Sequence, residues 1–228
     1  MRIAALFAIT ILAACASLDP IPAAQAQTQP NSPVAAALER DANASLNPAD
    51  APAGAYALDA RHASVIWRVR HMGLGLYTAR FDAIAGTLNF DPQNPAASSV
   101  NVTIAANSVS TGLINREGAR AFDGEIADVL GADEHPNITF VSRAVQQTGP
   151  TTGLITGDLT LNGRTNPVTI EASFHGGRFV QLRGRHVIAF SGRTIIRRSQ
   201  WGAGSVIFNQ FAGDDVEILI DAEFIRES

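Results

Sequence analysis

The stretch LITGDLTLNGRTNPVTIEASF, from Leu154 to Phe174, decides the fold class because alternating apolar residues flank a compact turn in it. Asn162 and Gly163 form the Asn-Gly pair that is typical of a two-residue hairpin, and Pro167 closes the loop. After the turn, apolar side chains recur at every second position and share one side of a strand: Val168, Ile170, Ala172 and Phe174. The stretch predicts a β-hairpin with one dry side, which must close over another sheet or over a ligand.

The same period of two recurs along the chain. It predicts strands near residues 56–60, 63–71, 80–90, 99–108, 137–146, 153–161, 167–175, 184–197 and 215–225. One helix is expected between Arg116 and Leu130, with Asn115 as its N-cap and Gly131 just past its end. About eight consecutive antiparallel strands predict an all-β fold, either an up-and-down barrel or a sandwich. A barrel of that size is either filled by side chains or holds one ligand.

The alternation of apolar and polar residues along the strands is not typical of a barrel that spans a membrane. Such a barrel is apolar outside and polar inside, and it carries girdles of aromatic residues. Only 7% of this chain is aromatic, and it ends on Ser228 rather than on an aromatic residue. We therefore expect the polar side of the strands to face outward and the apolar side to face the lumen.

The first residues have the pattern of an export signal. Met1 and Arg2 are followed by an apolar run, Ile3 to Ala14, that is too short to span a bilayer, which needs about 20 residues. Two cleavage sites compete: the segment LAAC ending at Cys15 resembles the lipobox of bacterial lipoproteins, and Ala24-Gln25-Ala26 fits ordinary signal peptidase. We favour the lipobox, because the apolar run stops at Cys15 and this is the only cysteine of the chain.

Composition divides the rest of the chain into two parts. Residues 16–54 are rich in Ala, Pro, Gln and Asn and predict a flexible tether, and residues 55–228 have the length of one domain. Acyl chains on Cys15 would anchor the protein to a membrane from the periplasmic side, and Ala16 after it favours the outer membrane. Cleavage after Ala26 would give a soluble periplasmic protein instead.

Charge and composition exclude several kinds of chemistry. All seventeen basic residues are arginine, so a Walker-type phosphate loop, a Schiff-base enzyme and a Ser-x-x-Lys acyl enzyme are excluded. A formal net charge of −4 argues against nucleic acid as a partner. No Gly-x-Ser-x-Gly elbow occurs, so the sequence predicts a non-catalytic protein without a cofactor.

One basic segment stands apart from this acidic balance. Six arginines occur with no Asp or Glu between Ala172 and Gly213: Arg178, Arg183, Arg185, Arg193, Arg197 and Arg198. We interpret most of them as solvated strand positions. The alternative is a basic rim that binds a phosphate head group, with Arg197 and Arg198 as the candidates.

Five groups of residues, taken in order, resemble the YceI-like family. They are Tyr56, Asp59, His62, Ser64, Trp67 and His71; Ser108, Val109, Thr111 and Gly112; HPNITF from His135 to Phe140 with Ser142; GDLTLNG from Gly157 to Gly163 with Thr165, Pro167 and Val168; and Arg198 with Trp201 and Gly202. The resemblance covers about residues 55–226. Between Gly112 and His135 the chain departs from the family: many members carry Arg-Asp-x-His-Leu there, and this chain reads AFDGEI from Ala121 to Ile126.

The resemblance implies an extended lipocalin-like antiparallel β-barrel with one or two short helices, exported to the periplasm. Its apolar tunnel would hold one long amphiphile, such as a polyprenyl phosphate, an isoprenoid quinone or a fatty-acid derivative. Combined with strand parity, this places eleven side chains in the lumen: Val65, Trp67, Val69, His71, Val102, Ile104, Phe140, Ile170, Phe174, Ile218 and Ile220.

Some residues keep more than one interpretation. His71 shares the parity of Trp67 and is expected near one mouth of the lumen, or else as a core histidine bonded to a carbonyl. His62 has the opposite parity and no two histidines have a zinc-like spacing, so no metal site is predicted. Trp201 is expected to pack in the core, with a cation-π contact to Arg197 or Arg198 or a lid over the mouth as alternatives.

Two function classes remain besides the carrier. One is a stress-related periplasmic interaction protein whose lumen is filled by its own side chains, and the other is a hydrolytic enzyme on a barrel scaffold. The sequence leaves the oligomeric state open, with a homodimer as one candidate.

Overall fold

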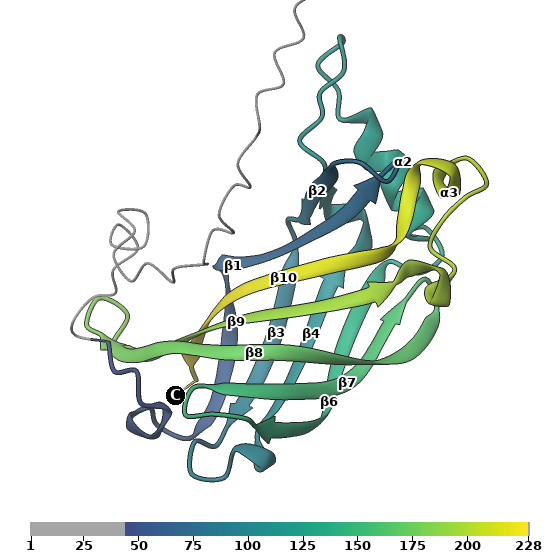
Figure 1. Cartoon of the computed structure of the whole chain (residues 1–228). Coiled ribbons are helices and arrows are strands. Elements are labelled where there is room, and N and C mark those ends of the chain that lie inside the picture. Colours follow the sequence, from purple (N-terminus) through teal and green to yellow (C-terminus); the bar gives the residue numbers. More distant parts are fainter. Residues whose placement is uncertain (1–43, 228) are drawn as a thin grey trace, which may run out of the picture. The chain divides into compact units, whose positions relative to one another are not determined.

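The computed structural model describes residues 44–227, and within them ten strands form one antiparallel sheet that closes on itself (Figure 1). The strands are β1 (Gly54–His71), β2 (Leu76–Phe81), β3 (Ile84–Phe90), β4 (Ser99–Ala105), β5 (Val109–Ser110), β6 (Asn137–Gln147), β7 (Thr152–Leu161), β8 (Arg164–Val180), β9 (Arg185–Arg197) and β10 (Ala212–Arg226). The eight-stranded barrel expected from the sequence is confirmed.

Closure comes from the pairing of the first strand with the last. β1 pairs with β10 from Tyr56↔Arg226 to His71↔Ala212, and the ring runs β1-β3-β4-β6-β7-β8-β9-β10. β2 continues the path of β3 along the second half of β1, and β5 continues β4 beside β2. Ten strands therefore occupy eight positions around the barrel. A closed ring leaves no long unpaired edge.

The hairpin of β7 and β8 forms as its sequence predicts. Asn162 and Gly163 both have positive φ, 48° and 67°, which is the geometry that an Asn-Gly pair favours in a two-residue turn. The turn also packs tightly: a Cβ on Gly163 would lie 2.5 Å from the ring of His135. The side-chain amide of Asn162 donates to the carbonyls of Trp201 and Gly202, at 3.2 and 3.3 Å.

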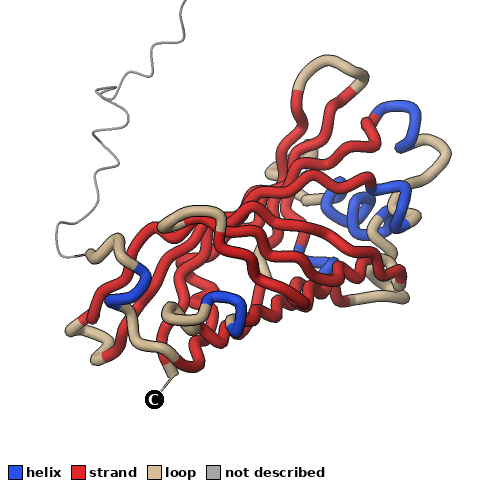
Figure 2. The backbone as a smooth tube through the Cα atoms, turned by 60° about the horizontal axis from the view of Figure 1, so that its bottom comes forward, coloured by secondary structure: helices blue, strands red, loops and turns tan. Residues whose placement is uncertain are grey.

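Helices lie at the ends of the strands (Figure 2). One end carries α2 (Ala121–Val129), η4 (Arg198–Trp201) and α3 (Phe208–Phe211), and the other η1 (Pro48–Asp50) and η2 (Pro95–Ala97); η3 (Ala106–Ser108) joins β4 to β5. The helix expected from Arg116 begins later, at Ala121. Asn115 caps a tight turn instead, where its Oδ1 accepts from the backbone N–H groups of Glu117 and Ala119. Gly131 follows the helix with φ 67°, as predicted.

Other expected boundaries also move. The two strands expected at 56–60 and 63–71 are one strand, β1, with a register shift between Leu58 and Ala63. The strand expected at 80–90 is divided into β2 and β3. β8 begins at Arg164 and ends at Val180, so it extends beyond both expected limits.

Part of the predicted tether contacts the barrel. Ser45 forms a β-bridge with Gly177, Ala51 is buried, and the Tyr56 hydroxyl donates to the Pro52 carbonyl at 2.6 Å. The ordered domain therefore includes residues before 55. Residues 1–43, with Cys15 and both expected cleavage sites, lie outside the described part.

Candidate functional site

The interior of the barrel holds a cavity of about 240 Å³ with apolar walls. Nine of the eleven side chains that strand parity places in the lumen line it: Val65, Trp67, Val69, Val102, Ile104, Phe140, Ile170, Ile218 and Ile220. The few polar residues in the lining are Ser64, Ser191, Thr194, Arg198 and Asp221. A cavity of this kind suits an apolar ligand, since nearly every group in its wall is hydrocarbon.

Alternation along the strands produces this lining. In β10, Ile218 and Ile220 face the cavity, while Glu217 between Val216 and Ile218 faces outward. Glu217 accepts from Arg68 Nε at 2.7 Å and from Arg193 Nε at 2.8 Å, across β1, β10 and β9. The outer surface thus binds neighbouring strands together with ion pairs, and the inner surface stays free of charge along this stretch.

His71 does not line the cavity, which corrects its expected place in the lumen. It is the last residue of β1, and Val69 is the last residue of that strand in the cavity wall. His71 is exposed and its ring stacks on Phe211, with centroids 6.4 Å apart. It lies at the rim of the barrel, outside the cavity wall.

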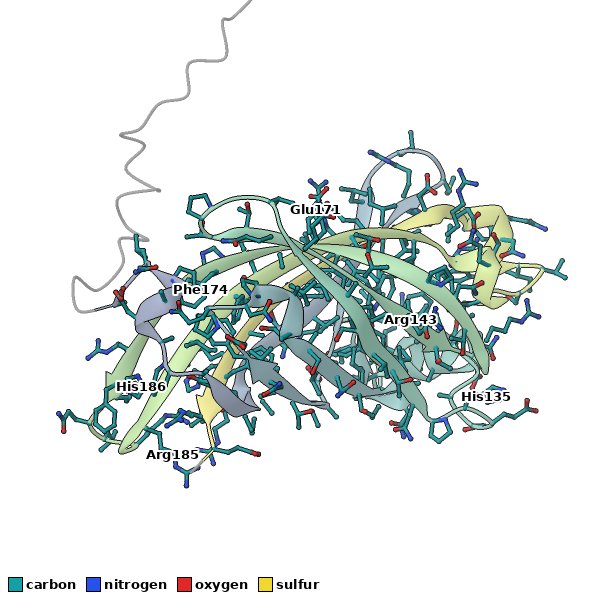
Figure 3. The ribbon with its side chains drawn as sticks, turned by 90° about the horizontal axis from the view of Figure 1, so that it is seen from below. His135, Arg143, Glu171, Phe174, Arg185 and His186 are labelled. Carbon is teal, nitrogen blue, oxygen red and sulfur yellow. The ribbon has the colours of Figure 1, made fainter. Side chains whose placement is uncertain are left out.

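Phe174 faces inward but does not line the main cavity, which corrects its placement. It lies in a group of phenylalanine rings nearer the end that carries Arg185 and His186, whereas His135 lies at the opposite end (Figure 3). Its ring is 6.3 Å from that of Phe90 and 5.3 Å from that of Phe190. These rings border a second pocket, of about 120 Å³.

The opposite end of the cavity is closed by residues that sequence reasoning missed. Ile126, Val129 and Leu130 come from α2 and the residue after it, and Phe208 comes from α3. The sequence predicts the helix α2 but not its place in the cavity wall, and α3 has only four residues and was not predicted. An apolar face at Ile126, Val129 and Leu130, spaced three and four residues apart, is the pattern that could have shown which side of α2 meets the cavity.

Arg198 is a structural residue rather than an open head-group site. It is buried, and its guanidinium donates to the carbonyls of Gly213, Ala203 and Ala212 at 2.8, 2.8 and 2.9 Å, and to Asn209 Oδ1 at 2.6 Å. Arg197 is exposed and lies 3.7 Å from Asp215. The two arginines therefore do not form one anion site.

The arginine segment as a whole does not form a basic rim. Arg183 lies in the turn after β8 and Arg198 lies after β9, at opposite ends of a strand about 40 Å long at 3.3 Å per residue. Arg183 pairs with Asp59 at 2.7 Å, and Arg193 pairs with Glu217. The acidic partners come from other strands, which the local sequence does not reveal.

Trp201 packs in the core as expected. It is almost fully buried, and its Nε1 donates to the carbonyl of Leu159 at 3.0 Å. The cation-π contact of this region is made by Arg198 over the ring of Phe208, at 5.2 Å from the centroid, and not by Trp201.

Within residues 44–227, three potential metal ligands lie together outside the cavity: Asp59, His62 and Glu223. The Nη2 atom of Arg183 lies 2.7 Å from Asp59 Oδ2 and 3.4 Å from His62 Nδ1, so a positive charge already occupies the cluster. Burial raises the pKa of Asp59, but bonds from His62 and the Arg61 N–H and the charge of Arg183 outweigh it, and the pKa is lowered. We assign this cluster to ion pairing.

Within the same described residues, no helix has the length and apolar character needed to cross a membrane.

Comparison with known proteins agrees with this architecture. A model of the YceI-like domain matches residues 56–224. A UPF0312 protein of Ectopseudomonas mendocina is 36% identical over 182 residues, which cover 78% of this chain and 90% of that protein. The crystal structure of BcnA from Burkholderia cenocepacia has a TM-score of 0.63 at 23% identity, covering 73% of this chain and 98% of its own. A polyisoprenoid binding domain from Saccharophagus degradans, implicated in plant cell wall breakdown, has a TM-score of 0.58 at 17% identity, covering 75% and 98%.

Proposed function

This chain belongs to the YceI-like domain family, and we propose that it is a non-catalytic carrier that holds one long amphiphile in the lumen of its barrel. The observation that carries the proposal is the cavity of about 240 Å³, whose wall is apolar and is built by side chains from around the ring. The similarity to a polyisoprenoid binding domain supports an isoprenoid chain as the ligand.

Size and energy both suit a chain ligand. An apolar cavity of about 150 Å³ holds one benzene ring, so a cavity of about 240 Å³ has room for a larger apolar group, such as part of an isoprenoid chain. Each buried methylene contributes about 0.8 kcal/mol, so one isoprene unit contributes roughly 3–4 kcal/mol before the costs of association. A few units therefore suffice for micromolar binding.

The lining of the cavity suits the apolar chain of a ligand but not a charged head group. Among the described residues, Arg198 is the only cationic one in the lining of the cavity, and its guanidinium already donates to three carbonyls and to Asn209. A phosphate buried without partners would cost several kcal/mol. We therefore propose that an uncharged ligand enters whole, and that a charged head group stays in water at a mouth.

A fluorescent prenyl or fatty-acid probe tests this function directly. Its emission should rise on binding to the full-length chain, with one probe per protein, and geranylgeraniol should displace it. A short alcohol such as geraniol should displace it much more weakly, because it buries fewer methylenes. If the probe does not bind, or binds without competition by either alcohol, the carrier function is wrong.

We also propose that the protein is exported to the periplasm and held at the outer membrane by acyl chains on Cys15. The support is the apolar run that ends at Cys15 and the absence of any other cysteine. Cell fractionation of Cys15→Ser tests it: this variant should leave the membrane fraction or accumulate as an uncleaved precursor. A wild-type N-terminus at Gln27 in a soluble periplasmic fraction would contradict the anchor.

A further inference from the structure

The second pocket lies at the end of the barrel where β6 turns into β7. It has a volume of about 120 Å³. Its inner part is lined by apolar side chains, and its outer part by neutral polar residues, among them Ser98, Ser99, Gln147, Thr151 and Thr152. Within the part of the chain that the structure describes, none of the residues that line this pocket is charged. The end of a ligand chain can therefore enter the second pocket without removing water from an ion pair.

The two pockets meet at one level of the barrel. Five residues from five strands line both pockets: Leu88 of β3, Val100 of β4, Ile155 of β7, Ala172 of β8 and Phe190 of β9. Leu88 and Val100 are direct partners in the β3–β4 register. These five side chains form a partition between the main cavity and the second pocket.

Phe190 is the largest member of this partition. Its ring contacts the ring of Phe224, which lines only the main cavity, with centroids 6.2 Å apart. On the other side it contacts Phe90 at 6.0 Å and Phe174 at 5.3 Å, and these two line only the second pocket. The ring therefore has neighbours that line only the main cavity and neighbours that line only the second pocket, and it stands between the two spaces.

We propose that Phe190 sets the length of chain that the barrel accepts. This inference rests on the proposed carrier function and adds a specificity-determining residue to it. With the ring in place, the main cavity ends at Phe190. Without the ring, the cavities of about 240 and 120 Å³ join, which adds room for about half as many atoms again.

A series of isoprenoid alcohols with about two, three, four and six isoprene units provides the test, by displacement of a fluorescent prenyl probe from the full-length chain. For the wild type, affinity should rise with chain length until the chain fills the main cavity and then level off. For Phe190→Ala, affinity should go on rising beyond the length at which the wild type levels off, by at least about tenfold, because added methylenes are now buried.

Phe90→Ala is the matched control. It removes the same ring from the wall of the second pocket alone, so the partition stays and the length profile should equal that of the wild type. Phe190→Leu removes the ring with a smaller loss of core volume and should extend the profile if Phe190→Ala does not fold. A folded Phe190 variant with the wild-type profile, or an equal extension in Phe90→Ala, would overturn the inference. Failure of the wild type to bind any alcohol would instead overturn the carrier function.

Discussion

The guanidinium of Arg198 lies 5.2 Å from the centre of the Phe208 ring, and Phe208 forms part of the cavity wall. The same guanidinium holds the backbone of Ala203, Ala212 and Gly213 through its hydrogen bonds. One buried cation therefore fixes the loop that carries α3 over this end of the barrel. An arginine suits this position because its planar fork presents several donors at once.

Replacing Arg198 with glutamine should destabilise the protein by about 2–4 kcal/mol, because buried carbonyls lose their donors. Urea unfolding at neutral pH measures this change. Arg197→Gln is the matched control, since Arg197 is exposed and its ion pair with Asp215 is long, and its effect should stay within about 0.5 kcal/mol. Equal effects of the two substitutions on stability would refute the role of Arg198 in fixing the loop that carries α3.

Gly163→Ala should cost about 1–3 kcal/mol, because alanine at φ 67° is strained. Its Cβ would also lie 2.5 Å from the His135 ring. The double variant with His135→Ala separates the two causes, since it relieves the steric clash and leaves the backbone strain. Thermal unfolding of the four proteins in this cycle should show that His135→Ala recovers part of the loss. If the effects of the two substitutions on stability are strictly additive, the His135 ring does not clash with the added Cβ.

Acid should weaken the barrel through Glu217. Burial raises the pKa of this carboxyl, but hydrogen bonds and charges from Arg68 and Arg193 outweigh burial and hold the pKa below its ordinary value of 4.5. A lowered folded-state pKa stabilises the protein above 4.5, and this stabilisation is lost as the pH falls through the folded value. Unfolding of Glu217→Gln should therefore depend less on pH than that of the wild type below pH 4.5. If the free energy of unfolding of both proteins falls equally below pH 4.5, Glu217 is not the source of the acid sensitivity.

The sequence predicts the regular parts of this fold because local rules govern them. A period of two places Ile170, Ile218 and Trp67 in the cavity wall, and an Asn-Gly pair predicts the turn at Asn162 and Gly163. These features depend on neighbouring residues alone. They suffice to predict a barrel with an apolar lumen.

The parts that the sequence did not predict depend on long-range contacts or on position along the barrel. His71 has the spacing of Trp67 and Val69 but lies past the cavity, at the end of β1, and periodicity does not show where a cavity ends. The burial of Arg198 depends on carbonyls more than ten residues away, at Ala212 and Gly213. Phe174 points to the expected side of its strand, but it lies in the second pocket, on the far side of Phe190 from the main cavity. Its position along the barrel axis follows only from the register of the whole sheet.

The central prediction is that the lumen itself holds the ligand. Ile170→Glu places a carboxylate in the cavity wall, and a buried charge without a partner costs several kcal/mol or draws water into the cavity. Ligand affinity should fall by about a hundredfold or more, since each 1.4 kcal/mol is about tenfold. Glu171→Gln is the matched control, because Glu171 is the next residue of β8 and lies on the outer surface (Figure 3).

Mass spectrometry of an organic extract from the purified protein tests this claim most directly. Wild type and Glu171→Gln should each release about one long-chain amphiphile per protein, and folded Ile170→Glu should release none, because one lumen holds one chain. No lipid from the wild type, or the same lipid in equal amount from all three proteins, would show that the barrel lumen is not the binding site.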